Sequence, residues 1–124
     1  MRLRTTVLTA LALAALSACG ANSSGSAQRL ADGATRAIYA DSYAGVVKDL
    51  GPNVSRTVTR ASVGAISDKM HALGSYQGLT LLASNPAKSE FTYRAAFQKG
   101  SMNVEVRLDN NGKLAAYRVF PTAS

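Results

Sequence analysis

The feature that most constrains the fold is a strict alternation of apolar and polar residues near the C-terminus. In segment 91–97 the apolar positions recur at every second residue. Segment 102–108 repeats the pattern more cleanly, with its apolar positions at Met102, Val104, Val106 and Leu108. A period of two places all apolar side chains on one face of an extended chain. Both segments are therefore predicted to be strands with one buried face and one polar face.

Turn signals connect these strands to further strands on each side. Lys99-Gly100 predicts a tight turn between them. Asp109-Asn110-Asn111-Gly112 predicts a hairpin after the second strand, because Asn and Gly tolerate a positive φ. A short strand is expected at 79–83, before the turn at Asn85-Pro86. A returning strand is expected at 114–120, whose faces the pattern does not assign. The prediction is an antiparallel meander of about four strands.

The half of the chain before these strands is predicted to be helical. Apolar residues at spacings of three and four predict one helix over 27–40 and another over 63–73. Gly74 is expected to end the second helix in a left-handed conformation. Helices followed by hairpin-linked strands define an α+β domain, in which the helices cover one face of the sheet.

Shorter helical segments are expected between the two main helices. Asp41 or Ser42 is a suitable N-cap for a segment that runs to Leu50. Gly51-Pro52 ends this segment, since proline lacks an amide donor and restricts the residue before it. An irregular stretch with about one helical turn follows. The next suitable cap is Thr59 or Ser62.

This order of elements resembles a known superfamily. The residues that carry the resemblance are the helix end at Leu73-Gly74, the strands 91–97 and 102–108, and the turn Asp109-Asn110-Asn111-Gly112-Lys113-Leu114. Together they resemble the cystatin-like, nuclear transport factor 2-like superfamily, in particular its small bacterial branch of unknown function. The resemblance covers roughly 27–121 and implies helices packed on a curved antiparallel sheet. A small βαββ module, as in secretion-system and pilus-associated lipoproteins, is a second candidate.

The N-terminus has the organisation of a secretory signal. Arg2 and Arg4 precede an apolar run of about ten residues, 7–16, which is well short of the roughly 20 residues that span a bilayer. A basic start, a short apolar segment and small residues at the cleavage site are typical of signal peptides. The segment ends in Leu16-Ser17-Ala18-Cys19, which resembles the lipobox of bacterial lipoproteins.

The lipobox resemblance implies a covalent membrane anchor. Cleavage would fall between Ala18 and Cys19, the Cys19 thiol would carry a diacylglyceryl group, and the new amine would be acylated. Gly20 follows the cysteine, a pattern that resembles outer-membrane lipoproteins facing the periplasm in bacteria with two membranes. We therefore expect a signal peptide at 1–18, a flexible Gly- and Ser-rich tether at 19–26, and one α+β domain at 27–124.

Cysteine content decides whether the fold can contain a disulfide, and net charge indicates which classes of partner are favoured. The chain has one cysteine, so its fold contains no internal disulfide. Removal of Arg2 and Arg4 reduces the 14 basic residues to 12 against 7 acidic residues, which leaves a net charge of +5. This bias favours anionic headgroups or acidic partners. Basic residues do not interleave with aromatic residues as a nucleic-acid surface requires, so nucleic acid is not an expected partner.

Few residues have the arrangement that catalysis requires. His71 is the only histidine, and Asp68 lies three residues before it, close enough to share a helix face. Tyr43, His71 and Tyr93 are the candidates for lining a pocket between helices and sheet. Arg94 and Arg107 lie on neighbouring predicted strands and would form a basic patch if both point away from the helices. We expect neither catalytic residues nor a metal site, because one histidine and scattered carboxylates lack ligand spacing.

These observations favour a non-catalytic binding or accessory module in the cell envelope. The expected partners are the membrane, through the lipid on Cys19, and an envelope protein. No cofactor is expected apart from the covalent diacylglycerol and N-acyl chains. Two alternatives remain open: a small-ligand carrier or enzyme that uses the space between helices and sheet, which requires a pocket of roughly 300 Å³, and an immunity or inhibitor lipoprotein.

Overall fold

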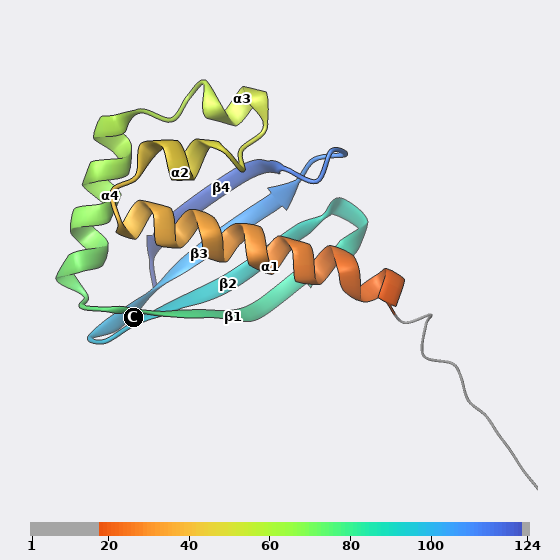
Figure 1. Cartoon of the computed structure of the whole chain (residues 1–124). Coiled ribbons are helices and arrows are strands. Elements are labelled where there is room, and N and C mark those ends of the chain that lie inside the picture. Colours follow the sequence, from red (N-terminus) through yellow and green to blue (C-terminus); the bar gives the residue numbers. More distant parts are fainter. Residues whose placement is uncertain (1–17, 123–124) are drawn as a thin grey trace, which may run out of the picture.

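Helices precede strands along the chain, as predicted (Figure 1). A computed structural model describes residues 18–122, with side chains from residue 25 onward. Residues 1–17, which hold most of the expected signal peptide, and 123–124 lie outside the described residues. The elements are α1 (Ala18–Tyr39), α2 (Tyr43–Val47), α3 (Pro52–Ser55), α4 (Arg60–Ala72), β1 (Tyr76–Asn85), the 3-10 turn η2 (Pro86–Lys88), β2 (Glu90–Phe97), β3 (Gly100–Leu108) and β4 (Leu114–Pro121).

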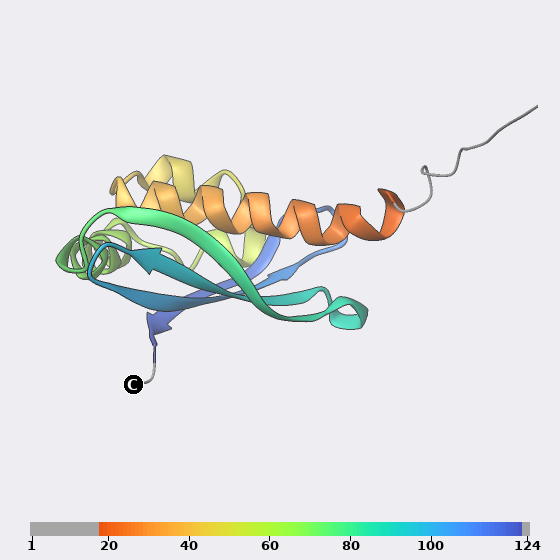
Figure 2. The same ribbon diagram turned by 90° about the horizontal axis from the view of Figure 1, so that it is seen from below.

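The strands form one open antiparallel sheet in the order β1-β2-β3-β4. The predicted α+β class and the predicted meander are therefore confirmed. Seen from below in Figure 2, the helices lie together on one side of the twisted sheet, and no helix of the described residues covers the other side. None of the helices between residues 18 and 122 combines the length and apolar character that a membrane-spanning helix requires.

The long helix α1 covers the sheet with a narrow stripe of mostly small residues. The buried positions are spaced three and four residues apart, as one face of a helix requires. They are Ala27, Ala31, Ala34, Thr35 and Ile38. The helix begins at Ala18, earlier than the predicted start near residue 27, and so includes the segment 19–26. The proposed division into signal, tether and domain stays a prediction.

The short helix α2 begins at one of its two predicted caps. The Ser42 side chain accepts a hydrogen bond from the Gly45 amide at 3.1 Å and caps α2, whereas Asp41 adopts a positive φ of 55°. The helix α2 ends at Val47 and does not continue to Leu50. After Gly51, α3 is a single turn. The expected irregular stretch with one helical turn is thus confirmed.

The helix α4 has capping residues at both ends. Of the two alternatives predicted for the cap, Thr59 is the N-cap, and Ser62 completes a capping box with it through reciprocal side-chain and amide hydrogen bonds. At the other end, Gly74 has a φ of +90°, which confirms the predicted left-handed end. A stripe that includes the buried Val63 and Met70 faces the core.

The register of the sheet assigns a face to each strand residue. On β2 and β3 the apolar partners Tyr93 and Val104 are buried, which confirms the predicted alternation. On β4, Val119 pairs with Val104 and so faces the helices. The strand β1 extends well beyond the predicted 79–83, because register irregularities near Gly78 and after residue 81 hide its alternation.

The core lies between α1 and the helix-facing side of the sheet. Its strand residues come from β2, β3 and the start of β4. They are Phe91, Tyr93, Ala95, Phe97, Met102, Val104, Val106 and Leu114. The opposite face carries the polar residues that alternate with these apolar ones, and within residues 18–122 no helix lies against it (Figure 2). The sheet therefore offers one complete face to other molecules.

Candidate functional site

The three residues expected to line a pocket have different surroundings. Tyr43 is half-buried, and its hydroxyl lies 3.5 Å from the Val58 carbonyl while Arg60 covers its ring at 4.7 Å. His71 is exposed at the end of α4, and Tyr93 is completely buried on β2. Each of the three has its own partners, and no hydrogen bond or ring contact within residues 18–122 joins them.

His71 acts as a link between two helices. Its ring stacks on Tyr39 with centroids 4.0 Å apart, and its Nε2 donates a hydrogen bond to the Tyr39 carbonyl at 2.8 Å. Because a carbonyl oxygen only accepts, this contact fixes the proton on Nε2. The Ser67 hydroxyl donates to the same carbonyl at 3.2 Å. His71 and Asp68, which the spacing could bring together on one helix face, are not among the ion pairs between described residues. His71 therefore supplies a hydrogen-bond donor to a carbonyl group at the carboxyl end of α1.

The buried tyrosines differ in their hydrogen bonding. The Tyr93 hydroxyl has no partner among the described residues, and burial raises its pKa to about 12. Tyr117 contacts Thr35 at 2.7 Å, and burial raises its pKa as well. Thr35 donates its one proton to the Ala31 carbonyl at 2.7 Å, so Tyr117 is the donor in the pair. Neither phenol ionises near neutral pH.

A third tyrosine belongs to a polar cluster at the edge of the helical layer. The Tyr76 hydroxyl donates to Asp32 at 2.7 Å, and the other Asp32 oxygen pairs with Arg36 at 2.8 Å. The Arg36 guanidinium lies 5.1 Å from the centre of the Tyr76 ring. Burial, followed by the Asp32 carboxylate, raises the pKa of Tyr76. The cluster ties α1 to the start of β1 through charge-assisted contacts.

The cavity enclosed by the helices and β4 is small, whereas a larger and more open hollow of about 540 Å³ lies between the end of α4 and the strands β3 and β4. A cavity of about 80 Å³ lies between the helices and β4. Its lining is almost wholly apolar and includes none of Tyr43, His71 and Tyr93. A typical small-molecule site occupies about 300 Å³ or more. A ligand of ordinary size therefore does not fit this cavity without rearrangement of the core.

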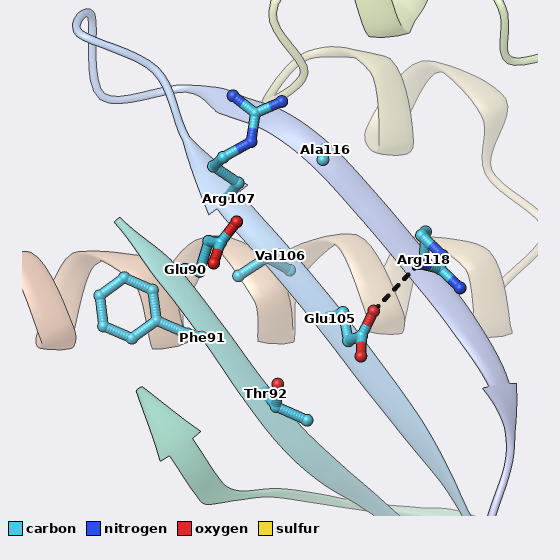
Figure 3. Close-up of a pocket in the computed structure, with 8 residues that line it drawn as sticks. All are labelled: Glu90, Phe91, Thr92, Glu105, Val106, Arg107, Ala116 and Arg118. Carbon is cyan, nitrogen blue, oxygen red and sulfur yellow. Dashed lines mark ion pairs between the residues drawn. The ribbon is translucent and has the colours of Figure 1, made fainter. Parts of the chain in front are cut away.

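The open face of the sheet carries a pattern of alternating charges (Figure 3). Glu105 on β3 pairs with Arg118 on β4 at 3.2 Å, with side chains that are 41% and 71% exposed. One row further along, Glu90 and Arg107 are direct cross-strand partners, but they do not form an ion pair. Thr92 lies opposite Glu105. The face thus presents both signs of charge to solvent.

These side chains surround a shallow hollow of about 250 Å³. Its lining comes from β2, β3 and β4 and is drawn in Figure 3: Glu90, Phe91, Thr92, Glu105, Val106, Arg107, Ala116 and Arg118. The Arg118 guanidinium also covers the ring of Phe120 at 5.5 Å. Exposed ion pairs of this kind contribute little stability, so their value to the fold is small. They are available to a partner.

The expected basic patch is broken up by acidic residues. Arg94 and Arg107 both occupy the open face, as the register requires. They are two rows apart, and the row between them carries Glu105. Sequence reasoning named the polar positions on β3 but missed the pair of Glu105 with Arg118. The faces of β4 could not be assigned, because two alanines precede Tyr117 and apolar residues occupy both faces of the strand.

Metal binding and similarity to known proteins add no further assignment. Among the described residues, no group of three or more His, Cys, Asp or Glu side chains is arranged to hold a metal ion. Comparison of the chain with protein-family models, with curated proteins and with solved structures finds no match.

Proposed function

We propose that this protein is a lipid-anchored component of the bacterial cell envelope and acts as a non-catalytic binding module. Its partner is another envelope protein, which docks on the open face of the sheet. The anchor is the lipid on Cys19, and in a bacterium with two membranes the domain faces the periplasm from the outer membrane.

Support for the anchor comes from the sequence. Arg2 and Arg4, the short apolar run 7–16 and the lipobox residues up to Cys19 follow one another in the order of a lipoprotein signal. Two or three acyl chains hold a protein on a membrane far more firmly than one chain does. A partner reachable from this anchor lies in the envelope.

Support for docking comes from the uncovered face of the sheet, which is the observation that carries the proposal. The helices of residues 18–122 lie on the other side, so one face of the sheet is free of them (Figure 2). The free side bears Glu90, Glu105, Arg107 and Arg118 in alternation. A mixed-charge surface favours a protein of complementary charge pattern over a uniformly charged polymer.

The fold is further proposed to be of the cystatin-like, nuclear transport factor 2-like kind. Helices that precede a four-stranded antiparallel meander, and cover one of its faces, support this assignment. Some enzymes of the superfamily that this chain resembles use the space between helices and sheet. The 80 Å³ cavity supports a binding module that uses its outer face instead.

The anchor is tested by the variant Cys19→Ser. We expect wild-type protein in the membrane fraction and Cys19→Ser as unprocessed precursor or soluble protein. Ser24→Ala, which leaves the lipobox intact, is the matched control and should fractionate like the wild type. Unchanged processing and membrane attachment of Cys19→Ser would refute the anchor.

Docking is tested by photocrosslinking in the native envelope. A photoreactive side chain at Thr92, on the open face, is expected to give one defined protein adduct. The same group at Ala65, on the exposed side of α4, should not. The double variant Glu105→Arg with Arg118→Glu keeps the internal ion pair but reverses its direction, and should abolish the adduct. Equal labelling from both positions, or an adduct insensitive to the double variant, would argue against docking on this face.

A further inference from the structure

The two edges of the sheet are treated differently by the chain. The β4 edge is covered where it begins: Leu50 forms a parallel bridge with Leu114. The Gly51 amide donates to the Leu114 carbonyl at 2.8 Å, and the Leu114 amide donates to the Asp49 carbonyl at 2.9 Å. Further along, β4 carries Arg118 and ends in Pro121, both of which oppose pairing with another strand.

The β1 edge lacks these protections. None of its ten residues is charged, whereas β2, β3 and β4 each carry at least one charged residue. Residues 80–85 are exposed throughout. The helix α1 reaches this strand through Gln28, whose amide lies 3.5 Å from the Leu79 carbonyl. An uncharged, exposed edge strand is a template for pairing with another strand.

This edge also holds the largest exposed apolar side chains. Leu81 and Leu82 are 42% and 43% exposed, and they are the two large hydrophobic residues classed as exposed in the described part of the chain. They are adjacent to each other and lie close to the middle of β1. Burial of these two half-exposed leucines against another molecule would be favourable, because within one copy they remain partly in contact with water.

We propose that two copies of this chain associate through their β1 edges, about a twofold axis beside Leu81 and Leu82. Antiparallel pairing of two identical strands about such an axis brings the middle of one strand against the middle of the other. The leucine pairs of both copies therefore meet. The inference does not depend on the lipid anchor or on the partner of the open face.

Charge favours a second copy as the occupant. The chain carries a formal charge of +7, or +5 without Arg2 and Arg4 of the expected signal peptide, so two copies repel each other over most of their surface. The ten residues of β1 contribute nothing to this repulsion. They form the segment at which like-charged copies can approach, and the contact is complementary to itself because the strand is the same on both sides.

The geometry also limits the assembly to two copies. A growing sheet requires a second free edge on each copy, and the start of β4 is already bonded to residues 49–51. On β1, the register irregularity between Leu81 and Ala83 interrupts a regular ladder. Because this irregularity lies beside the proposed axis, few main-chain bonds form there, and the leucine side chains carry the contact. A contact of one strand buries little area, so we expect concentration-dependent dimers.

The test places a positive charge at Leu82 in one variant and a negative charge at the same position in another. The full chain, purified in detergent, is examined by density-matched sedimentation at increasing concentration. The wild type should show a monomer–dimer equilibrium. Leu82→Lys places like charges across the axis and should weaken association at least about tenfold, and Leu82→Glu should do the same. An equimolar mixture of the two variants should dimerise again, because only mixed pairs bring opposite charges together.

Ala65→Lys is the matched control, since it adds the same charge on an exposed position of α4 and should leave dimerisation unchanged. Circular dichroism of each variant verifies that the exposed substitutions leave the fold intact. Wild-type protein that stays monomeric up to roughly millimolar concentration, beyond the range of weak specific contacts, would overturn the proposal. So would undiminished dimerisation of Leu82→Lys, or a mixture of Lys and Glu variants that fails to pair.

Discussion

The imidazole of His71 stacks on the ring of Tyr39 at a centroid distance of 4.0 Å and donates a hydrogen bond to the carbonyl of that same residue. One side chain on α4 thus holds both the ring and the main chain at the end of α1. This arrangement explains why the only histidine of the chain lies at a helix end, without assigning it a role in catalysis.

Removal of this link should destabilise the domain. We expect His71→Ala to lower the free energy of unfolding by about 1 kcal/mol, through loss of one hydrogen bond and one ring contact. Urea denaturation followed by circular dichroism measures the change. Asp68→Ala is the control and should shift stability by less than about 0.5 kcal/mol, as is usual for exposed sites. Equal effects of both variants would instead favour a functional pair of the two residues.

Two buried tyrosines should respond in opposite directions to loss of the hydroxyl. Tyr93→Phe removes a buried hydroxyl that has no hydrogen-bond partner among residues 18–122 and should leave stability unchanged or raise it by up to about 1 kcal/mol. Tyr117→Phe removes the donor to Thr35 and should lower stability by about 1 kcal/mol. Denaturation curves of the two variants, measured side by side, provide the test. A clear loss of stability in Tyr93→Phe would reveal a bound partner for its hydroxyl.

Stability should fall steeply at alkaline pH. Burial raises the pKa of Tyr93 to about 12, and burial also raises the pKa values of Tyr76 and Tyr117. In the unfolded chain these phenols ionise near pH 10. Because the pKa values are higher in the folded state, the contribution of these phenols to the free energy of unfolding is complete below pH 10. It is lost as the pH rises toward 12 and beyond. Tyrosinate absorbance and urea denaturation between pH 8 and pH 12 should change together. Titration of all five tyrosines near pH 10, in a protein that stays folded, would contradict this prediction.

Two glycines near α4 should respond oppositely to alanine. Gly74 has a φ of +90°, and an added Cβ would lie 2.8 Å from the Cβ of Gln98, so Gly74→Ala should cost about 1–3 kcal/mol. Gly64 lies within the helix, where the nearest atom to an added Cβ is 3.7 Å away. Gly64→Ala should therefore stabilise by about 0.5–1 kcal/mol. Thermal unfolding of both variants measures the contrast, and a neutral Gly74→Ala would mean that the helix end can shift.

The parts of the fold with a regular pattern could be predicted from the sequence. Strands β2 and β3 lie between a helical layer and solvent, so one face of each strand is apolar and the other is polar. The alternation of residue types around Tyr93 and Val104 follows from this difference. Caps such as Thr59 and Gly74 could be found because their side-chain chemistry or backbone freedom is needed at one defined place.

The other parts depend on contacts that the local pattern does not contain. The full length of β1 is set by pairing with β2 and by two register irregularities, which break the alternation. The early start of α1 runs through 19–26, where Gly, Ser and Asn have low helix propensity. The contact of His71 with Tyr39 joins residues 32 positions apart, and no spacing rule predicts it. The open-face pair Glu105–Arg118 required the register of β4.

The most direct test of the proposed role at the membrane is the intact mass of the protein isolated from its native envelope. A lipoprotein begins at Cys19 and carries the added mass of a diacylglyceryl group and an N-acyl chain, and it partitions with the membranes. A soluble chain that begins at Met1, with an unmodified thiol on Cys19, would contradict the account.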